Sequence, residues 1–478
     1  MTAEPSARAQ IRTVNPATNV PIARYEPFDE KDITRAIADS GAAQQDWSAR
    51  AHADRATAVT SAAEILRERR AEFARLITSE MGKPLAESVA EIEKCAVACD
   101  FYAAHSAGFL ADEAVETSAD RSWVGYEPLG TVLAVMPWNF PFWQVFRCAV
   151  PALMAGNSVL LKHAPNTTGC ALAVEALLRD AGLPAGLFTA LLIAEADVPE
   201  VIERLIGDPG VSAVTVTGSE RTGSSVAAAA GRAIKKSVLE LGGSDPFIVL
   251  ADADLPPTVA MAARSRFLNG GQSCIAAKRF IVEAAVATAF TQMLVAAVEA
   301  LVVGDPMQED TDVGPMARED LLDDLDRQVR ASVATGAALL VGGRRMDRAG
   351  WFYQPTVVTD VRPGMPLYDE ETFGPVAAVV VVDDADHAVR VANDTRYGLA
   401  MSVWTADLTV GEALARRVHS GAVFVNAVVA TDVRMPFGGT RHSGYGRELA
   451  AAGIREFVNT RSWWSMRLPA GGAAPSTE

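Results

Sequence analysis

The chain has 478 residues, a length that corresponds to roughly two to four domains. Hydrophobic residues make up 49% and charged residues 21%, so a large core can form without disulfides or metals. The net charge of −16, with no local Lys/Arg cluster, excludes nucleic acid as a partner, because phosphate binding needs a basic face. No stretch reaches the roughly 18 apolar residues of a membrane span, and the N-terminus lacks the apolar run of a secretory signal.

The cysteines are sparse and odd in number, namely Cys95, Cys99, Cys148, Cys170 and Cys274. Without a secretory signal, this usage indicates reduced thiols and a cytoplasmic protein. Cys95 and Cys99 share one face of a predicted helix, where a metal site would need more ligands, so we expect them in the core. The spacing of His163, His387, His419 and His442 does not match that of metal ligands, so we predict no metal.

The first half of the chain is predicted to be helical and then to alternate between strands and helices. Residues 1–10 and 469–478 are small and polar and are predicted to be disordered. From about 29 to 107 the pattern is helical, and Gly82 is placed to end one helix. Apolar runs rich in β-formers follow at 131–136, 157–162, 187–192, 212–217 and 245–250. Helical stretches separate most of them, at 166–181, 197–206 and 220–231. This alternation predicts a parallel sheet covered on both faces, with a ligand at the carboxyl ends of its strands.

A second alternating block follows Cys274 and predicts a second α/β domain. Its strands are expected at 278–283 and 377–382, and its helices at 286–301 and 319–335. Two segments, 118–128 and 455–467, fit neither block. We expect them to pair as a hairpin or arm outside both domains.

Two glycine-flanked residues are the strongest candidates for chemistry. Cys274 ends NGGQSC and Glu240 lies in ELGGSDP. A thiol nucleophile needs a base, either for its own activation or for that of a later water, and glycines permit close approach of backbone and ligand. Each residue alone has an ordinary alternative: a buried structural cysteine and a surface glutamate near a strand end. Together they predict covalent chemistry at an electrophilic carbon.

Two further motifs follow predicted strands. Asn139, in MPWNFPFW, sits where a strand opens into a loop, and its amide can donate to a developing oxyanion. The alternatives are an Asx turn for Asn139 and core packing for its aromatic neighbours. The sequence Thr217-Gly218-Ser219 opens a helix, where a pyrophosphate can bind the helix N-terminus. An ordinary serine N-cap explains that motif equally well.

Ordered motifs along the chain together resemble the aldehyde dehydrogenase superfamily. They are PWNFP, Leu161-Lys162, TGS, LELGG, GQSC, EETFGPV (370–376), FVN (424–426) and PFGGxxxSGxGRE (436–448). The resemblance runs from about Thr13 to Trp464. It implies Cys274 as the nucleophile that forms a thiohemiacetal and then a thioester. It also implies an oxyanion hole from the Asn139 amide and the Cys274 N–H, and Glu240 as the base that activates the hydrolytic water.

The resemblance also implies a fold and an assembly. The fold class is α/β, with a Rossmann-like cofactor domain at 11–117 and 130–241, onto which 428–454 packs, and a catalytic domain at 242–427. Residues 118–129 and 455–467 would form a small oligomerisation arm. Members of the family are dimers or tetramers.

Cofactor contacts follow by resemblance. Lys162 matches the residue at the adenosine ribose, Glu371 the carboxylate at the nicotinamide ribose, and Phe373 its neighbour. Positions near the pyrophosphate and in the cofactor cleft are matched by Trp138, Thr217, Gly218, Ser219 and Gly242.

One departure bears on cofactor choice. NAD-preferring relatives often carry Glu where this chain has Pro165. A carboxylate there would repel a ribose 2′-phosphate, whereas proline would not and Lys162 would be free to pair with it. We therefore predict NADP as the preferred cofactor, with NAD also accepted. The alternative is that Pro165 only starts the next helix.

Substrate contacts are predicted on the helix after Asn139. Gln144 and Arg147 are three positions apart, so they share a face of this helix. By resemblance, both match positions that line the aldehyde tunnel. A guanidinium at such a position favours a substrate with a carboxylate. Thr431 and Phe437 match further tunnel positions, and Glu448 a proton relay. The strings LKHAPN, VLELGGSDPFIV and GQSCIAAKRF are most similar to bacterial succinate-semialdehyde dehydrogenases.

Several alternatives remain for the substrate site. Arg147 is alternatively a surface arginine or an intersubunit ion pair. Leu268 replaces a second arginine of many relatives, and the sequence does not place Arg266 or Arg434. The second cysteine that some relatives use for redox switching is Ala276 here.

The predicted reaction is NAD(P)-dependent oxidation of succinate semialdehyde, a small aldehyde with a distal carboxylate. Glutarate semialdehyde or another short aldehyde is an alternative substrate. A CoA-acylating enzyme is disfavoured by Glu240, because such relatives lack the base. A non-catalytic protein that kept the fold is disfavoured by the intact Cys274, Glu240 and Asn139.

Overall fold

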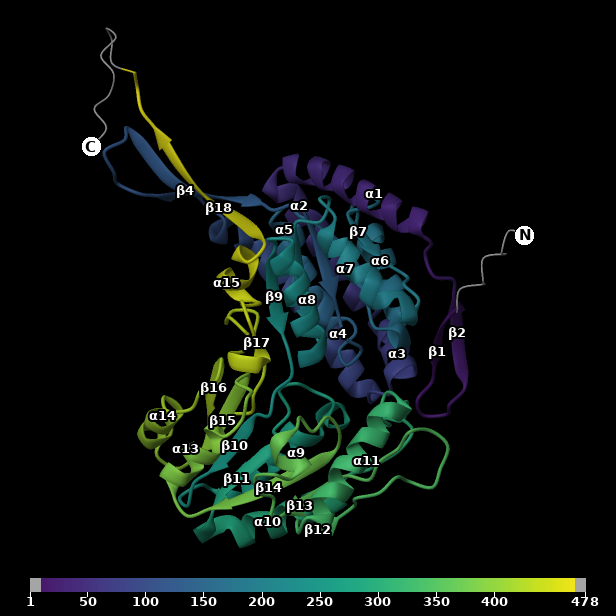
Figure 1. Ribbon diagram of the computed structural model, residues 1–478, viewed down its shortest axis with the longest axis vertical. Coiled ribbons are helices and arrows are strands. Elements are labelled where there is room, and N and C mark those ends of the chain that lie inside the picture. The colour runs from purple at the N-terminus through teal and green to yellow at the C-terminus, as the bar shows by residue number, and fades with distance from the viewer. Residues whose placement is uncertain (1–9, 469–478) are drawn as a thin grey trace.

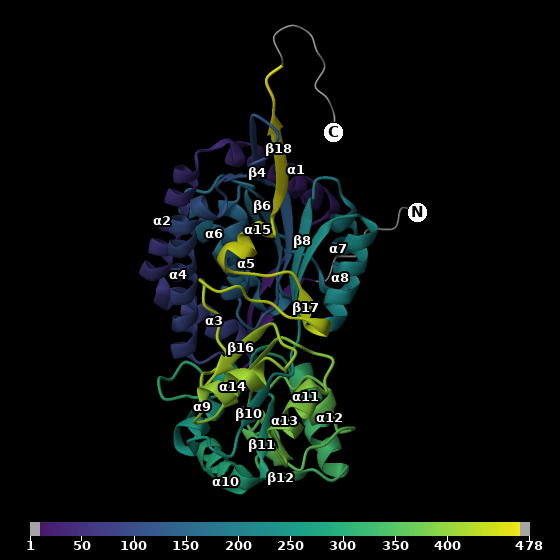
Figure 2. The ribbon, with the colours of Figure 1, turned by 90° about the vertical axis from the view of Figure 1, so that its left-hand side faces the viewer.

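The computed structural model describes residues 10–468, and their strands form four sheets. Figures 1 and 2 show two large α/β bodies, one above the other, and a narrow arm that leaves the upper body. The tails predicted to be disordered, 1–10 and 469–478, lie outside the described residues except for Gln10.

The N-terminal part is helical, as the sequence predicts. A small hairpin of β1 (Ile11–Val14) and β2 (Pro21–Tyr25) precedes α1 (Glu30–Ala49), α2 (His52–Glu68), α3 (Arg70–Met81) and α4 (Leu85–Phe109). Gly82 ends α3 in the left-handed conformation, at φ 81°, as expected of a C-terminal glycine. Cys95 and Cys99 are buried in the core, which confirms the packing prediction for this pair.

The upper body contains a six-stranded sheet in the order β17-β9-β8-β5-β6-β7. The strands are β5 (Thr131–Val135), β6 (Ser158–Lys162), β7 (Phe188–Ala190), β8 (Ala213–Thr217), β9 (Lys236–Glu240) and β17 (Gly444–Tyr445). All pairs are parallel except β17 with β9. Between them lie α5 (Trp143–Met154), η1 (Pro165–Thr167), α6 (Thr168–Asp180), η2 (Glu195–Asp197), α7 (Val198–Gly207) and α8 (Glu220–Arg232).

The lower body contains a seven-stranded sheet in the order β12-β13-β14-β11-β10-β15-β16. The strands are β10 (Pro246–Val249), β11 (Arg279–Glu283), β12 (Ala338–Val341), β13 (Thr356–Thr359), β14 (Val376–Val382), β15 (Ala400–Trp404) and β16 (Ala422–Val425). Only β12 pairs antiparallel. The helices are α9 (Leu255–Phe267), η3 (Leu268–Gly271), α10 (Ala284–Glu299), α11 (Glu319–Ala334), α12 (Pro366–Asp369), α13 (Ala385–Asn393) and α14 (Leu408–Ala415). The apolar run at 245–250 belongs to this sheet.

The central strands of both sheets are buried along their whole length because helices cover both faces. All residues of β5, β8 and β10 are buried. This composition is typical of strands in covered parallel sheets. Each buried aliphatic side chain contributes about 1.5–3 kcal/mol, which fixes the strand ends that carry the candidate site.

The arm is a three-stranded sheet, in which β4 (Arg121–Pro128) pairs antiparallel with β18 (Val458–Ser465) and with β3 (Glu113–Ala114). Trp123 stacks on Trp463 across the pair, with ring centroids 5.3 Å apart. The expected pairing of 118–128 with 455–467 is therefore present, and β3 adds a strand that the sequence did not suggest. η4 (Arg441–Ser443) and α15 (Ala450–Arg455) lead into β18.

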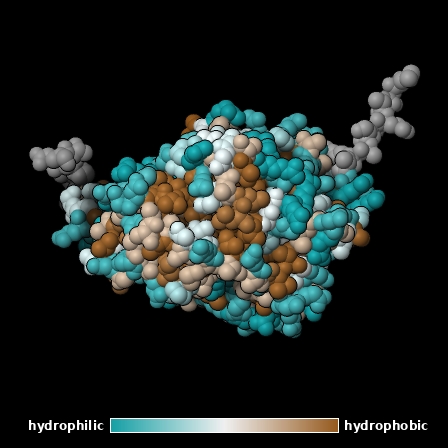
Figure 3. Space-filling view, turned by 90° about the horizontal axis from the view of Figure 1, so that it is seen from below, coloured by the Kyte–Doolittle hydropathy of each residue, from teal (hydrophilic) through white to brown (hydrophobic). Residues whose placement is uncertain are grey.

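The end of the lower body is apolar. Seen from below, apolar side chains gather across the face where Figure 1 places α10, β12 and β13 (Figure 3). The exposed large hydrophobic residues of this region include Val302, Leu339 and Leu340. A contiguous apolar surface of this kind is typical of a protein contact.

Candidate active site

The predicted catalytic residues come from three separate loops that the fold brings together. Asn139 follows β5, Glu240 is the last residue of β9, and Cys274 follows η3. The Asn139 amide Nδ2 donates to the Gln272 carbonyl at 3.1 Å, which joins the first loop to the cysteine segment. The Cys274 thiol is free and partly exposed, and Glu240 acts on it electrostatically.

A left-handed turn carries the cysteine. Asn269, Gly270 and Gly271 have φ of 55°, 59° and 72°, which glycine tolerates best. A Cβ on Gly271 would lie 2.2 Å from the Gly374 carbonyl oxygen, so only glycine fits. The Asn269 side chain closes the turn by donating to the carbonyls of Asn139 and Gln272, at 2.9 and 3.1 Å. The glycines of NGGQSC therefore serve a close backbone approach.

The oxyanion donors predicted from the sequence are available. An amide nitrogen carries two donors, and Asn139 uses one of them for Gln272. Among residues 10–468, the N–H of Cys274 donates to no protein acceptor. Two N–H groups can thus point at one developing negative charge beside the thiol.

Glu240 is a buried carboxylate with one satisfied oxygen. Its Oε1 accepts from the Gly439 N–H at 3.1 Å, and its Oε2 has no hydrogen-bond donor within the described chain. Burial raises the pKa of Glu240 to about 8, against the opposing charge of Arg147. A carboxyl group that titrates near the working pH is suited to general base catalysis.

The Cys274 thiol is protonated in this state. Burial raises the pKa of Cys274 to about 12, and the negative charge of Glu240 adds to this, while Arg147 and Lys278 oppose it. Because the thiolate is the nucleophile, the proton must leave during the attack.

Arg147 is the central cation of the site. It is 2% exposed, so it is not a surface arginine. Its Nε forms an ion pair with Glu448, its Nη2 lies 3.8 Å from Glu240 Oε2, and its Nη2 also donates to Thr217 Oγ1 at 3.3 Å. The guanidinium lies over the Phe437 ring, 5.2 Å from its centroid. Burial also raises the pKa of Glu448, and Arg147 opposes that shift.

The other predicted substrate residues lie around the same helix. Gln144 is buried, and its Oε1 has no partner within residues 10–468. Thr431 Oγ1 accepts a hydrogen bond from Lys94 of α4, which the sequence did not single out. Arg266 and Arg434 lie elsewhere: Arg266 donates to the carbonyls of Thr372, Gly374 and Ala277, and Arg434 is an exposed partner of Asp432. Leu268 is 39% exposed.

The predicted adenosine end contains a carboxylate that the sequence did not place there. Lys162 is the last residue of β6. Pro165 begins the helix η1, which agrees with the alternative that this proline only starts the next helix. Burial lowers the pKa of Lys162 to about 8, while nearby Glu195 raises it and Arg318 lowers it. Pro165 therefore does not leave this region free of negative charge.

The predicted nicotinamide end is built around Glu371. Its Oε1 accepts from Lys278 Nζ at 2.9 Å and from the Gly243 N–H at 3.0 Å. A Cβ on Gly242 would lie 2.2 Å from Glu371 Oε2, so this glycine makes room for the carboxylate. Lys278 also donates to the Cys274 carbonyl at 2.7 Å. The lysine, another residue that the sequence did not single out, thereby links the carboxylate to the cysteine loop.

The remaining cofactor positions are arranged as a strand end and a helix start. Ser219 caps α8 by accepting from the Thr222 N–H at 3.2 Å, and Gly218 N–H donates to the Glu240 carbonyl at 3.0 Å. Trp138 meets Phe373 edge to face, with ring centroids 5.8 Å apart. The N-terminus of α8 thus faces the carboxyl ends of the strands, where phosphates bind in such folds.

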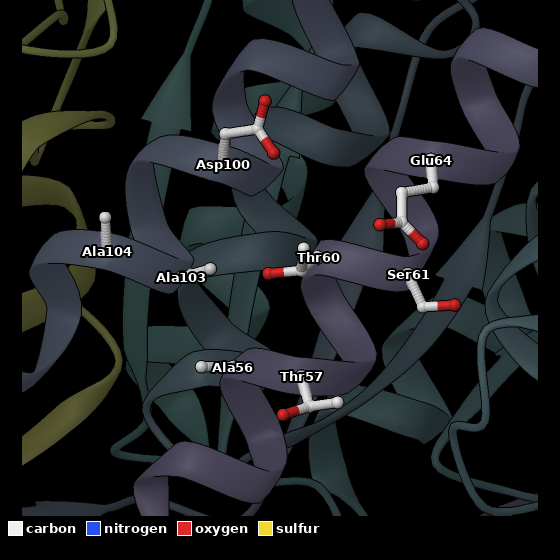
Figure 4. Close-up of a pocket in the computed structure, with 8 residues that line it drawn as sticks. All are labelled: Ala56, Thr57, Thr60, Ser61, Glu64, Asp100, Ala103 and Ala104. Carbon is white, nitrogen blue, oxygen red and sulfur yellow. The ribbon is translucent and has the colours of Figure 1, made fainter.

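A separate groove of about 570 Å³ lies between α2 and α4 (Figure 4). Its walls include Thr57, Thr60, Glu64 and Asp100, and no predicted site residue lines it. Within the described residues, no cluster of His, Cys, Asp and Glu has the form of a metal site. None of the helices between residues 10 and 468 has the length and apolar character needed to cross a membrane.

Comparison with known proteins identifies the family. The family model "Aldehyde dehydrogenase family" matches residues 3–463. A "Probable succinate-semialdehyde dehydrogenase [NADP(+)]" from Synechocystis is 48% identical and covers 95% of this chain and 99% of its own. A "Succinate semialdehyde dehydrogenase [NAD(P)+]" from Escherichia coli is 46% identical, over 98% and 100% of the two chains. The crystal structure of a Streptococcus pyogenes succinic semialdehyde dehydrogenase in complex with NADP+ superposes with a TM-score of 0.92, at 34% identity over 96% and 100%. The chain belongs to the aldehyde dehydrogenase family.

Proposed function

We propose that this protein oxidises succinate semialdehyde to succinate, with NADP+ as the preferred cofactor and NAD+ as a second. The observation that carries the substrate is the buried Arg147, which lies on the same helix as Gln144 and 3.8 Å from the proposed base Glu240. A guanidinium at this position favours an aldehyde with a distal carboxylate. The names of the Synechocystis and Escherichia coli relatives support the same substrate and cofactors.

In the first half of the proposed reaction, Cys274 is acylated. Its Sγ, which is partly exposed, forms a bond to the aldehyde carbon and gives its proton to water. The Asn139 amide and the Cys274 N–H stabilise the oxyanion of the thiohemiacetal. A bound nicotinamide supplies the acceptor for the hydride that leaves this carbon, which produces a thioester on Cys274.

In the second half, Glu240 takes a proton from a water that attacks the thioester carbon. The bond to Sγ breaks, Sγ takes that proton back from Glu240, the acid leaves, and the thiol is restored. The unsatisfied Oε2 of Glu240 is free to accept from that water. Arg147 holds the pKa of Glu240 below the value that burial alone would give. Glu448, its other partner, is suited to relay protons away from the site.

The residues present fit a nicotinamide dinucleotide. Lys162 is a half-buried cation without an ion-pair partner in the described chain, the N-terminus of α8 offers N–H groups to phosphate, and Gly242 makes room for Glu371. We expect Lys162 at the adenosine ribose, Thr217, Gly218 and Ser219 near the pyrophosphate, and Glu371 with Phe373 and Trp138 at the nicotinamide.

The first test compares succinate semialdehyde, glutarate semialdehyde and hexanal in the wild type and in Arg147→Met. We expect wild-type kcat/KM to be highest for succinate semialdehyde. The variant should lose about tenfold to a hundredfold on that substrate, the value of a charge-assisted hydrogen bond. Because Arg147 also lowers the pKa of Glu240, the rise of kcat with pH should move to higher pH for every aldehyde.

Measurements at a pH above that rise separate the two effects. An equal loss on hexanal and succinate semialdehyde there would remove Arg147 from the substrate site. Arg147→Lys, which keeps the charge, serves as the matched control. A wild-type preference for hexanal would overturn the proposed substrate. A preference for glutarate semialdehyde would keep the distal carboxylate but lengthen the proposed substrate by one carbon.

The second test concerns Glu195. Its charge acts on Lys162, so Glu195→Gln should raise the ratio of kcat/KM for NADP+ to that for NAD+, by roughly twofold to tenfold at low salt. Lys162→Met should lower the same ratio. Glu200→Gln removes an equal charge in the first turn of α7 and should leave the ratio unchanged. An unchanged ratio in Lys162→Met would remove this lysine from the 2′-phosphate.

Hydrolysis rather than transfer to CoA is the proposed fate of the thioester because the chain has the proposed base Glu240, whose charge acts on Cys274. Addition of CoA should leave the rate unchanged. We further propose a cytoplasmic homodimer or homotetramer, whose contacts use the arm and the apolar end of the lower body, where Val302, Leu339 and Leu340 are exposed.

A further inference from the structure

We infer that Lys94 is a substrate-binding residue, which holds the distal carboxylate of the aldehyde together with Thr431 and thereby sets the specificity of the site. This inference rests on the proposed function, because it assigns a partner to the carboxylate of the proposed substrate.

The position of Lys94 follows from three contacts. Its Nζ donates to Thr431 Oγ1, a residue that the sequence places at the substrate. The same Nζ lies 4.4 Å from the ring centroid of Trp143, the first residue of α5, directly before Gln144. Arg147 lies near enough for its charge to lower the pKa of Lys94. Lys94 therefore projects from α4 toward the helix that carries the predicted substrate residues.

The charges around Lys94 are unbalanced. Within residues 10–468, no carboxylate lies within ion-pair distance of its ammonium group. By contrast, the buried lysines Lys83 and Lys278 are paired, the first with Glu91 and the second with Glu371. A desolvated cation without a counter-charge is costly, so such groups usually meet an anion. The missing anion at Lys94 fits a carboxylate supplied by the ligand.

Arg147 alone does not provide an unpaired positive charge for the ligand carboxylate. Its Nε is already paired with Glu448, and its Nη2 is shared between Glu240 and Thr217. Two cations then face the ligand. The charge of Arg147 is largely neutralised by protein carboxylates, whereas the charge of Lys94 is not. The ligand carboxylate therefore gains most binding free energy at Lys94, where it can accept hydrogen bonds from both an ammonium and a hydroxyl group.

The state of Lys94 is consistent with this role. Burial lowers its pKa to about 8, Arg147 and Lys83 lower it further, and Cys95 and Glu91 oppose them. The charge of Lys94 also contributes to the lowered pKa of Asp432, although Asp432 forms its ion pair with Arg434. At neutral pH most Lys94 side chains remain charged, and a bound carboxylate would raise the pKa again.

The test compares succinate semialdehyde with butanal, which has the same length but ends in a methyl group. In Lys94→Met, kcat/KM for succinate semialdehyde should fall about tenfold to a hundredfold, through KM, while the values for butanal stay near wild type. Lys94→Arg should retain much of the preference. Lys31→Met, which removes one positive charge from exposed α1, should behave as the wild type.

A second readout does not depend on turnover. Succinate should raise the Tm of the wild type and of Lys31→Met, and should raise that of Lys94→Met much less. Equal losses on both aldehydes, or none, would show that Lys94 does not contact the substrate. Butanal activity also reports whether the variant folds.

The two proposals fail in different ways. If the wild type prefers butanal to succinate semialdehyde, the proposed function falls and the role of Lys94 falls with it. If the wild type prefers succinate semialdehyde and Lys94→Met keeps that preference, only the role of Lys94 is overturned.

Discussion

Replacing Cys274 by alanine is expected to lower the rate of aldehyde oxidation by at least about four orders of magnitude, because only binding and oxyanion stabilisation then remain. The Asn139 and Gln272 contacts hold the loop through its backbone and neighbouring side chains rather than through the thiol. Binding of NADP+, measured by quenching of tryptophan fluorescence, should therefore persist. Steady-state absorbance of NADPH measures the loss.

Cys99→Ala is the matched control for this experiment, since it removes a buried thiol of α4 outside the site. It should keep near wild-type activity. Substantial turnover in Cys274→Ala would contradict the covalent mechanism. Loss of both activity and cofactor binding would instead indicate a disturbed fold.

Glu240→Gln is expected to slow deacylation by roughly 10²–10⁴-fold, the usual value of a general base. With saturating succinate semialdehyde, the variant should show a burst of NADPH followed by a slow steady state, because the thioester accumulates on Cys274. Rapid-mixing absorbance separates the two phases. Hydroxylamine, which attacks a thioester directly, should restore part of the steady-state rate.

The pH profile gives an independent check of the same residue. Burial raises the pKa of Glu240 to about 8, and the base works only when deprotonated, so wild-type kcat should rise as the pH increases through that value. The rise should vanish in Glu240→Gln. A wild-type steady state in this variant, with the rise intact, would assign the base to another group.

Much of this architecture is predictable because local patterns and the fold agree. The alternation of apolar runs with helices from residue 130 onward predicts a covered parallel sheet, and β5, β6 and β8 begin within a residue of the expected positions. Asn139 and Glu240 follow or end such strands, so their meeting at one edge is expected. The glycines beside Cys274 and Glu240 in the sequence signal close approach, which the contacts of Gly271 and Gly242 explain.

The partners of the charged residues are less predictable because they come from distant segments. Lys94 and Thr431 are 337 positions apart, and Lys278 meets Glu371 across 93. A lysine on an amphipathic helix usually faces water, so nothing in the pattern distinguishes Lys94 from its neighbours. Pro165 is only one of the positions that set the charge around Lys162, and Glu195 acts on this lysine from η2, 30 positions beyond the proline.

Glu240 depends on a part of the chain that lies far beyond it in the sequence. The Gly439 N–H that binds its Oε1 lies 199 positions later, and β17 pairs Gly444 with Glu240 itself. A nascent chain can complete both sheets' central strands while this carboxylate still lacks its fixed orientation. The site is therefore assembled only after translation has passed Gly444, well beyond both the nucleophile and the base.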